Sequence, residues 1–225
     1  MPRAMDDHFD LKFLAIGDSG VGKTCLLNQY IDGEYIKTLG TTVGIDIRDK
    51  TIFYKSNKTN KSYSISLQLW DTAGQERYRS LTTSFFRDAM GFLLVFDLTN
   101  ETSFLNVRNW ISEIQSNAYS ENVDMILIGN KCDLDTERII TKARALEFAR
   151  QTQVEYIETS ALQNVNVAES VELLLDLVMN RLEENENFST KKNIHLPKRT
   201  SEQINSGLIG NNIKKRKDLS FCCNY

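Results

Sequence analysis

Eight residues near the N-terminus, GDSGVGKT at 17–24, have the types and spacing that bind phosphate. They match the pattern G-x-x-x-x-G-K-[ST], in which backbone N–H groups surround phosphate oxygens, the lysine reaches the β and γ phosphates and the hydroxyl holds Mg²⁺. A glycine turn that leads into an amphipathic helix is the alternative interpretation. We expect a nucleotide site with contacts from Gly17, Asp18, Ser19, Gly20, Val21, Gly22, Lys23, Thr24 and Cys25.

The base is predicted from NKCD at 130–133, because the phosphate loop alone fits ATPases, kinases and GTPases alike. A fixed carboxylate at Asp133 accepts hydrogen bonds from N1–H and the N2 amine of guanine, whereas adenine presents an acceptor at N1 and would leave that charge unpaired. An ATPase or small-molecule kinase would need an adenine pocket in place of Asp133. We expect guanine contacts from Asn130, Lys131 and Asp133 and, in ETSAL at 158–162, from Ser160, Ala161 and Leu162.

The segment WDTAGQE at 70–76 supplies groups for the metal and for hydrolysis. Asp71 is placed to assist Mg²⁺ through water, Gly74 can present a backbone N–H to the γ phosphate, and Gln75 can orient a water. The predicted catalytic residues are Gln75, Lys23 and Gly74. A GTP-dependent binding module that does not hydrolyse its ligand is the rival interpretation, and a single-turnover phosphate-release assay separates the two.

Short apolar runs precede these polar groups. Runs that begin at Leu11, Gly91 and Asp124 each end in polar, small or acidic residues, as strands buried on both faces of a parallel sheet do. A similar run begins at Val154. Ligands of such sheets bind beyond the carboxyl ends of the strands, so the polar strand ends are expected to converge on one site.

Helical patterns lie between these strands, at 104–114 and 167–182. One segment differs: YSISLQLW at 63–70 alternates apolar and polar residues, and TIFY at 51–54 precedes it across a polar spacer, which predicts an antiparallel hairpin. The consistent fold class is α/β, of the P-loop NTPase type. It has a mostly parallel central sheet with one antiparallel edge strand and helices on both faces.

Length and composition fit one globular domain with appendages, since the chain has 225 residues and is 41% hydrophobic. The longest apolar stretch, at 89–96, is too short to cross a bilayer, and the N-terminus has no apolar signal core. The 4 cysteines lack metal-ligand spacing, which indicates reduced thiols. An intracellular, soluble chain is therefore expected.

The end of the chain differs in charge from the rest. From Phe188 onward there are eight basic and two acidic residues, a net charge of +6, so the first 187 residues carry −9. The tail is polar and lacks a sustained apolar period, which predicts disorder. We divide the chain into a short N-terminal extension (1–10), a folded domain (11–186) and a disordered tail (187–225). Nucleic-acid binding through KKRK at 214–217 is not expected, because no stacking aromatics accompany the run.

In order along the chain, the phosphate loop, DTAGQ, NKCD and SA resemble the Ras-like GTPases, over about Leu11 to Glu184. TTVGID at 41–46, WDTAGQERYRSL at 70–81 and FFRDA at 85–89 resemble Rab segments, and the long hairpin insert is most similar to the branch numbered twenty-seven, associated with secretory granules and melanosomes. The resemblance implies a Ras-like G domain with GTP/GDP and Mg²⁺ as cofactors. It also implies GTP hydrolysis and a role in vesicle trafficking and exocytosis.

The resemblance implies further residue roles. Thr42 would be the magnesium ligand of the first switch and Tyr35 would pack edge-on to guanine, although Tyr35 can also be a surface aromatic. Two loops, at about 34–43 and 74–81, would be ordered only while the γ phosphate is present. No arginine lies in the phosphate loop, so slow hydrolysis is expected until an activator supplies one. The implied metal ligands are Thr24, Thr42 and Asp71.

The implied effector surface departs from the family at one position. Rabs carry an aromatic triad that bridges the two switches, and Trp70 and Phe85 match two of its members, but the third position is Ile47. A missing ring removes a large apolar contact, so effectors of the related branch are expected to bind this chain weakly. The implied effector residues are Val43, Gly44, Ile45, Asp46, Ile47, Trp70, Tyr78 and Phe85.

The chain ends in CCNY, which is a poor CaaX box but is similar to the endings that Rab geranylgeranyl transferase modifies on both cysteines. Cys222 and Cys223 are therefore the expected lipid sites, with KKRK as an electrostatic helper at the membrane. The implied partners are effectors, an exchange factor, a GTPase-activating protein, a GDP-dissociation inhibitor and a prenylation escort. The G domain is expected to be monomeric, on the cytoplasmic face of vesicles or other endomembranes, with a cytosolic GDP-bound pool.

Overall fold

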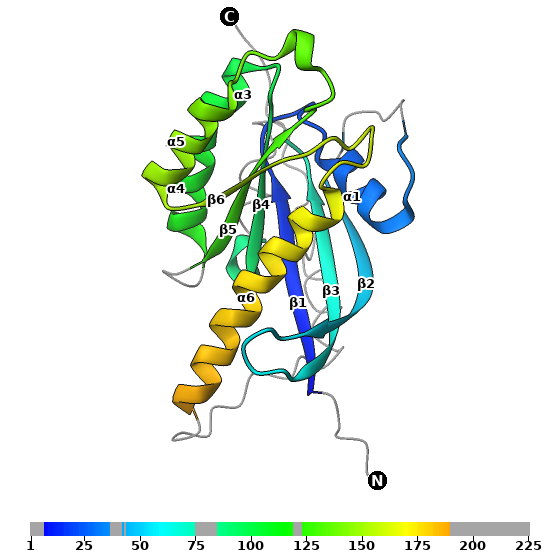
Figure 1. Cartoon of the computed structure of the whole chain (residues 1–225), viewed down its shortest axis with the longest axis vertical. Coiled ribbons are helices and arrows are strands. Elements are labelled where there is room, and N and C mark those ends of the chain that lie inside the picture. Colours follow the sequence, from blue (N-terminus) through cyan, green and yellow to red (C-terminus); the bar gives the residue numbers. More distant parts are fainter. Residues whose placement is uncertain (1–6, 37–41, 43, 75–84, 119–122, 190–225) are drawn as a thin grey trace, which may run out of the picture. The chain divides into compact units, whose positions relative to one another are not determined.

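The computed structural model describes residues 7–36, 42, 44–74, 85–118 and 123–189. The chain divides into two units, Met1–Glu186 and Asn187–Tyr225, and the fold is that of the first. Its sheet has the order β2-β3-β1-β4-β5-β6, and only β2 and β3 pair antiparallel, which confirms the predicted sheet (Figure 1). The strands are β1 (Asp7–Ile16), β2 (Ile45–Lys55), β3 (Ser62–Thr72), β4 (Gly91–Asp97), β5 (Asp124–Asn130) and β6 (Glu155–Glu158).

Helices cover both faces of the sheet, as predicted (Figure 1). Because side chains alternate along a strand, Phe13 of β1 packs in one core with α1 and α6, and Leu14 packs in the other with α3, α4 and α5. None of the helices in the described ranges is both long and apolar enough to cross a bilayer. The helices are α1 (Lys23–Asp32), α3 (Glu101–Leu105), α4 (Val107–Asn117), α5 (Lys142–Thr152), α6 (Val167–Ser189), and the 3-10 turns η2 (Phe86–Asp88) and η3 (Asp135–Glu137).

The first strand starts earlier than the sequence predicts. β1 begins at Asp7, four residues before Leu11, and pairs there with β3. His8 and Asp10 are exposed, while Phe9 packs against the ring of Tyr63 at 5.4 Å between centroids. This end of β1 alternates polar and apolar residues because only one of its faces is packed, so it lacks the continuous apolar run used to locate the strand. Residues 7–10 therefore belong to the sheet and not to an extension.

The helical pattern at 104–114 is formed by two helices. α3 begins at an N-cap, Asn100, whose side chain accepts a hydrogen bond from the backbone of Ser103. The chain then turns at Asn106, with φ of −69° and ψ of −14°, before α4 starts at Val107. Because Asn106 stays in the right-handed region, the apolar period continues through the break. The break turns Asn106 toward the phosphate loop.

Candidate nucleotide site

The phosphate loop joins β1 to α1 at the carboxyl edge of the parallel strands. Gly22 is the N-cap of α1 with φ of 96°. The N–H groups of a first helical turn have no intrahelical acceptors, and no described side chain caps this helix, so these donors are available to an anion. A Cβ at Gly22 would lie 2.4 Å from Asn130 Nδ2. That amide donates a hydrogen bond to the carbonyl of Val21 at 2.9 Å. The loop is thus fastened directly to the segment predicted to bind the base.

The Lys23 side chain lies inside the curve of the loop. It is buried, and its ammonium donates hydrogen bonds to the carbonyls of Gly17 at 2.9 Å and Asp18 at 2.8 Å. Burial lowers the pKa of Lys23 to about 8, although the carboxylates of Asp71 and Asp18 act in the opposite direction. A buried ammonium of this kind is stabilised by an anion placed beside it.

Three oxygen-bearing side chains meet next to Lys23, one each from α1, the segment before β2, and β3. The Thr24 hydroxyl donates to Asp71 Oδ2 at 2.5 Å and lies 2.9 Å from the Thr42 hydroxyl. Asp71 is buried, and its other oxygen, Oδ1, has no hydrogen-bond partner among the described residues. Burial raises the pKa of the Asp71 carboxyl. Hydroxyl and carboxylate oxygens with an unused buried lone pair are the donors that a hard cation prefers.

The predicted base-binding residues converge at the ends of β5 and β6. Asn130 is buried, and its Oδ1 accepts hydrogen bonds from the Thr159 hydroxyl at 3.1 Å and the Ala161 backbone at 3.3 Å. The Ser160 hydroxyl donates to Asp133 Oδ1 at 2.6 Å. These bonds hold the Asp133 carboxylate next to the segment that carries Ala161, so one edge of the carboxylate is fixed by the protein.

Lys131 has an acidic partner that the sequence analysis missed. Its ammonium pairs with Asp97 Oδ2 at 2.6 Å, and Asp97 is the buried last residue of β4. Lys131 itself has a positive φ of 67°. The sequence analysis noted that the run beginning at Gly91 ends in polar or acidic residues. It did not connect Asp97 with Lys131, because only the pairing of β4 with β5 brings the two residues together.

Asp18 was predicted as a nucleotide contact, but the sequence analysis missed the partners of its side chain. The side chain points away from the loop and accepts hydrogen bonds from Asn106 Nδ2 at 2.7 Å and Trp110 Nε1 at 2.8 Å, both on the α3–α4 side of the sheet. The peptide that follows Asp18 lies against Gly74, where a Cβ would come within 2.4 Å of the Asp18 carbonyl carbon. Gly74 is thus packed on the phosphate loop, and no side chain fits there.

Some of the other predicted residues lie within the described ranges and some lie outside them. Cys25 is half-buried and packs against the core, Leu162 is exposed, and Tyr35 is 38% exposed without a ring contact to another described aromatic residue. Those predicted positions that lie outside the described residues are Val43, Gln75, Tyr78, Cys222 and Cys223.

Part of the predicted effector surface is formed where β1, β2, β3 and η2 meet. Trp70 and Phe85 lie with ring centroids 5.3 Å apart, and Ile47 is opposite Trp70 in the β2–β3 ladder and 45% exposed. The Lys12 ammonium lies 3.9 Å from the centre of the Trp70 ring and donates to the Phe85 carbonyl at 2.8 Å. The two rings and the lysine therefore form one cation–π cluster, beside which Ile47 supplies a smaller apolar side chain.

The fold and this site define a P-loop nucleotide-binding domain whose base pocket suits guanine. The Ras family model matches residues 12–180, and the chain therefore belongs to the Ras family. Members of this family are GTPases that hydrolyse GTP to GDP, and they bind both nucleotides.

Curated relatives narrow the family further. The chain is 55% identical to human Ras-related protein Rab-27A over 182 residues, which cover 79% of this chain and 82% of the relative. It is 54% identical to human Rab-27B over 183 residues, covering 80% of this chain and 84% of that protein. For Rab-27A of Rattus norvegicus the identity is 56% over 182 residues, with the same coverage as the human protein. The predicted similarity to the Rab branch numbered twenty-seven is confirmed.

Proposed function

We propose that the chain is a Rab switch that recruits effectors to secretory vesicles in its GTP form and releases them after hydrolysis. Ras-family membership supports GTPase activity, and similarity to Rab-27A and Rab-27B supports secretory vesicle traffic. The observation that carries the nucleotide choice is the Asp133 carboxylate. It is connected through Ser160, Ala161 and Asn130 to the phosphate loop by hydrogen bonds, so phosphates and base are bound by one rigid unit.

In the proposed complex, Lys23 binds the β and γ phosphates, and Thr24, Thr42 and Asp71 hold Mg²⁺. When bound, Mg²⁺ neutralises charge on the phosphate oxygens. The unpartnered Asp71 Oδ1 supports this assignment, because a buried carboxylate oxygen without a hydrogen bond is costly unless a ligand satisfies it. In the proposal the backbone N–H of Gly74 contacts the γ phosphate, and the close approach of Gly74 to the phosphate loop supports this role.

Gln75 orients the attacking water in this proposal, a role that rests on the family resemblance because Gln75 lies outside the described residues. The phosphate loop contains no arginine, so intrinsic hydrolysis is slow and an activator protein supplies the missing cation. In Ras such an arginine increases the rate by roughly 10⁵-fold. A Gln75→Leu variant with wild-type intrinsic and activated rates would remove Gln75 from the mechanism.

The γ phosphate orders the loops at 34–43 and 74–81 in the proposed GTP state, and effectors bind there and at the Trp70 cluster. An exchange factor, an activator, a GDP-dissociation inhibitor and a prenylation escort act at other stages. The doubly prenylated tail holds the protein on the cytoplasmic face of vesicles, and the GDP form returns to the cytosol. The resemblance of CCNY at 222–225 to doubly prenylated endings supports the anchor.

Calorimetry on nucleotide-stripped full-length protein with magnesium tests the nucleotide choice. We expect tight binding of GTP and GDP and no measurable binding of ATP, because adenine leaves the Asp133 carboxylate unpaired. Asp133→Asn is expected to weaken GTP binding by on the order of 10²-fold or more, since sites built on such pairing discriminate strongly.

Asp135→Asn is the matched control for this experiment, because Asp135 lies two residues further on and its side chain is 86% exposed. It should bind GTP like the wild type. Equal affinities for ATP and GTP, or an Asp133→Asn variant that binds GTP normally, would refute the assignment of the base pocket.

A further inference from the structure

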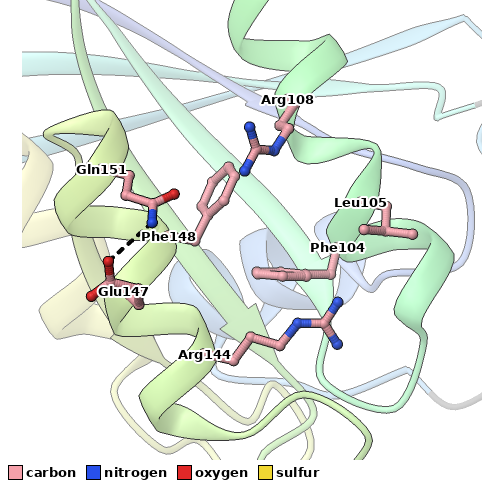
Figure 2. A pocket seen from close by; sticks show the side chains of 7 residues that line it. All are labelled: Phe104, Leu105, Arg108, Arg144, Glu147, Phe148 and Gln151. Atoms are coloured by element: carbon pink, nitrogen blue, oxygen red, sulfur yellow. Dashed lines mark hydrogen bonds between the residues drawn. The ribbon is translucent and has the colours of Figure 1, made fainter.

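A pocket outside the nucleotide site shares no lining residue with it. It has a volume of about 240 Å³ and is formed by side chains of α3, α4 and α5 (Figure 2). Phe104 and Phe148 form its apolar wall, with ring centroids 5.3 Å apart in an edge-on arrangement. Both rings are almost fully buried, whereas Leu105 at the rim is 55% exposed. The apolar surface that a group entering from solvent can reach is therefore mainly that of Leu105.

Two arginines approach this apolar wall from different helices, as Figure 2 shows. The Arg108 guanidinium lies 5.2 Å from the centre of the Phe148 ring, and the Arg144 guanidinium lies 5.1 Å from that of Phe104. Stacking on a ring uses the face of a guanidinium and leaves the N–H groups at its edge available as donors. Each arginine thus lies against an aromatic ring, and the stacking itself uses none of its N–H donors.

The charges around the pocket leave one cation unmatched. Arg144 pairs with Glu101 at 2.8 Å, and Glu147 lies 3.8 Å from Arg150 and accepts a hydrogen bond from Gln151 at 3.0 Å. Arg108 makes no hydrogen bond or ion pair with any residue in the described part of the chain. A ligand with one negative charge would balance the pocket, whereas a phosphate dianion would also be repelled by Glu147.

We propose that this pocket binds an acidic segment of a partner protein. An Asp or Glu carboxylate of the partner accepts hydrogen bonds from Arg108, and a neighbouring aromatic or aliphatic side chain packs on the exposed Leu105 at the rim. Arginine suits this role because its planar guanidinium pairs with a carboxylate in a bidentate manner. The pocket shares no residue with the Trp70 cluster, so this partner does not compete for the residues that an effector would contact there.

NMR titration of uniformly ¹⁵N-labelled, GDP-loaded full-length protein tests the site with small probes. The probe 3-phenylpropionate carries a carboxylate on an aromatic body, and 3-phenylpropionamide is its neutral match. We expect saturable shifts of the backbone amides of Leu105, Arg108 and Phe148 with the carboxylate, at a dissociation constant on the order of 1–10 mM for so small a ligand. The amide should bind at least about fivefold more weakly, because it lacks the charge-assisted pair.

The variant Arg108→Gln should weaken binding of 3-phenylpropionate about tenfold and keep the GDP-bound spectrum elsewhere. Lys142→Gln is the control, because it removes the same charge from α5 without lining the pocket. Equal binding of carboxylate and amide, or wild-type binding by Arg108→Gln, would reject a carboxylate site. Tighter binding of phenyl phosphate would assign the pocket to a phosphorylated residue or lipid headgroup instead, and the absence of saturable shifts would show that it is not a site.

Discussion

Asp18 connects the phosphate loop to the opposite side of the sheet. Its side chain accepts hydrogen bonds from Asn106 and Trp110, and its carbonyl accepts one from the Lys23 ammonium. The same peptide lies against Gly74, the first residue of the loop proposed to respond to the γ phosphate. Asp18 therefore contacts Asn106 and Trp110 through its carboxylate, and Lys23 and Gly74 through its backbone.

Removing the Asp18 carboxylate should speed up nucleotide release, although this carboxylate bonds to Asn106 and Trp110 and not to the nucleotide in our proposal. For Asp18→Ala we expect GDP release to become about tenfold faster, because the loop loses two hydrogen bonds and leaves the Asn106 amide and the Trp110 N–H without their acceptor. Asp18→Asn, which keeps one acceptor oxygen, should lie between Ala and the wild type. Release of a fluorescent GDP analogue into excess GDP measures the rate. An unchanged rate in Asp18→Ala would mean that the loop holds its position without the bridge.

Single residues that belong to a motif could be placed from the sequence, and residues that act as long-range partners could not. Lys23, Thr24 and Asp133 lie where their spacing after buried strands predicts, because spacing within a strand and loop is set by local geometry. The pairs formed by Asp18 with Trp110 and by Lys131 with Asp97 join segments far apart in the chain. No local spacing encodes such pairs, so they emerge only when the elements are packed.

The β2–β3 hairpin is bound to α6 by a buried carboxylate. Glu183 accepts hydrogen bonds at 2.9 Å from the hydroxyls of Ser56, Thr59 and Tyr63, and both Glu183 and Ser56 are buried. From the sequence, the spacer between the two strands was expected only to be a polar turn. Burial alone would raise the pKa of Glu183, but these three hydroxyls outweigh it and hold the pKa below its usual value.

Replacing Glu183 should therefore destabilise the domain. We expect Glu183→Gln to reduce the free energy of unfolding of GDP-loaded protein by about 2 kcal/mol, because a charge-assisted acceptor of three hydroxyls becomes a neutral amide. Glu184→Gln is the matched control: its carboxylate pairs with Lys58 at 2.8 Å on the surface and should cost less than about 1 kcal/mol. Urea unfolding measures both, and equal losses in the two variants would contradict the role of Glu183.

The same contact has a defined pH dependence. A carboxylate with a lowered folded-state pKa stabilises the fold fully above its unfolded pKa of about 4.5, and this contribution is lost as the pH falls through the lower folded value. The stability difference between wild type and Glu183→Gln should therefore be constant from pH 7 to about 5.5 and shrink below about 4.5. A difference that grows on acidification would have the wrong sign.

Most of the sheet could be predicted because buried parallel strands are continuous apolar runs, as β4 and β5 are. The start of β1 could not, because only one face is packed there and the pattern changes to alternation. The break between α3 and α4 was hidden because Asn106 keeps right-handed backbone angles and so preserves the apolar period. At both places the hydrophobic pattern of the sequence does not mark the boundary of the element, so the early start of β1 and the break between α3 and α4 were not predicted.

At the scale of the whole molecule, charge is divided between the folded domain and the tail. The first 187 residues carry −9 and the remainder +6, with four consecutive basic residues at 214–217 close to Cys222 and Cys223. These residues lie outside the described part of the structure, so their role follows from the sequence. An anionic leaflet attracts a basic segment and repels an acidic one, so the proposed membrane anchor and the charge of the tail favour the same contact.

Membrane binding by the basic run weakens as the salt concentration rises, whereas anchoring by two lipids does not. The salt dependence of vesicle binding therefore separates the two contributions. One chain gives marginal, reversible membrane binding and two give stable anchoring, while each basic residue adds about 1 kcal/mol near an anionic surface at low salt. We therefore expect protein from eukaryotic cells to carry two geranylgeranyl groups by intact mass and to stay on vesicles in high salt.

Cys223→Ser should carry one group, bind anionic vesicles at low salt and dissociate at high salt. Ser220→Ala, which keeps both cysteines, should behave like the wild type. An unmodified wild-type C-terminus, or salt-resistant binding by Cys223→Ser, would show that the paired cysteines are not the anchor.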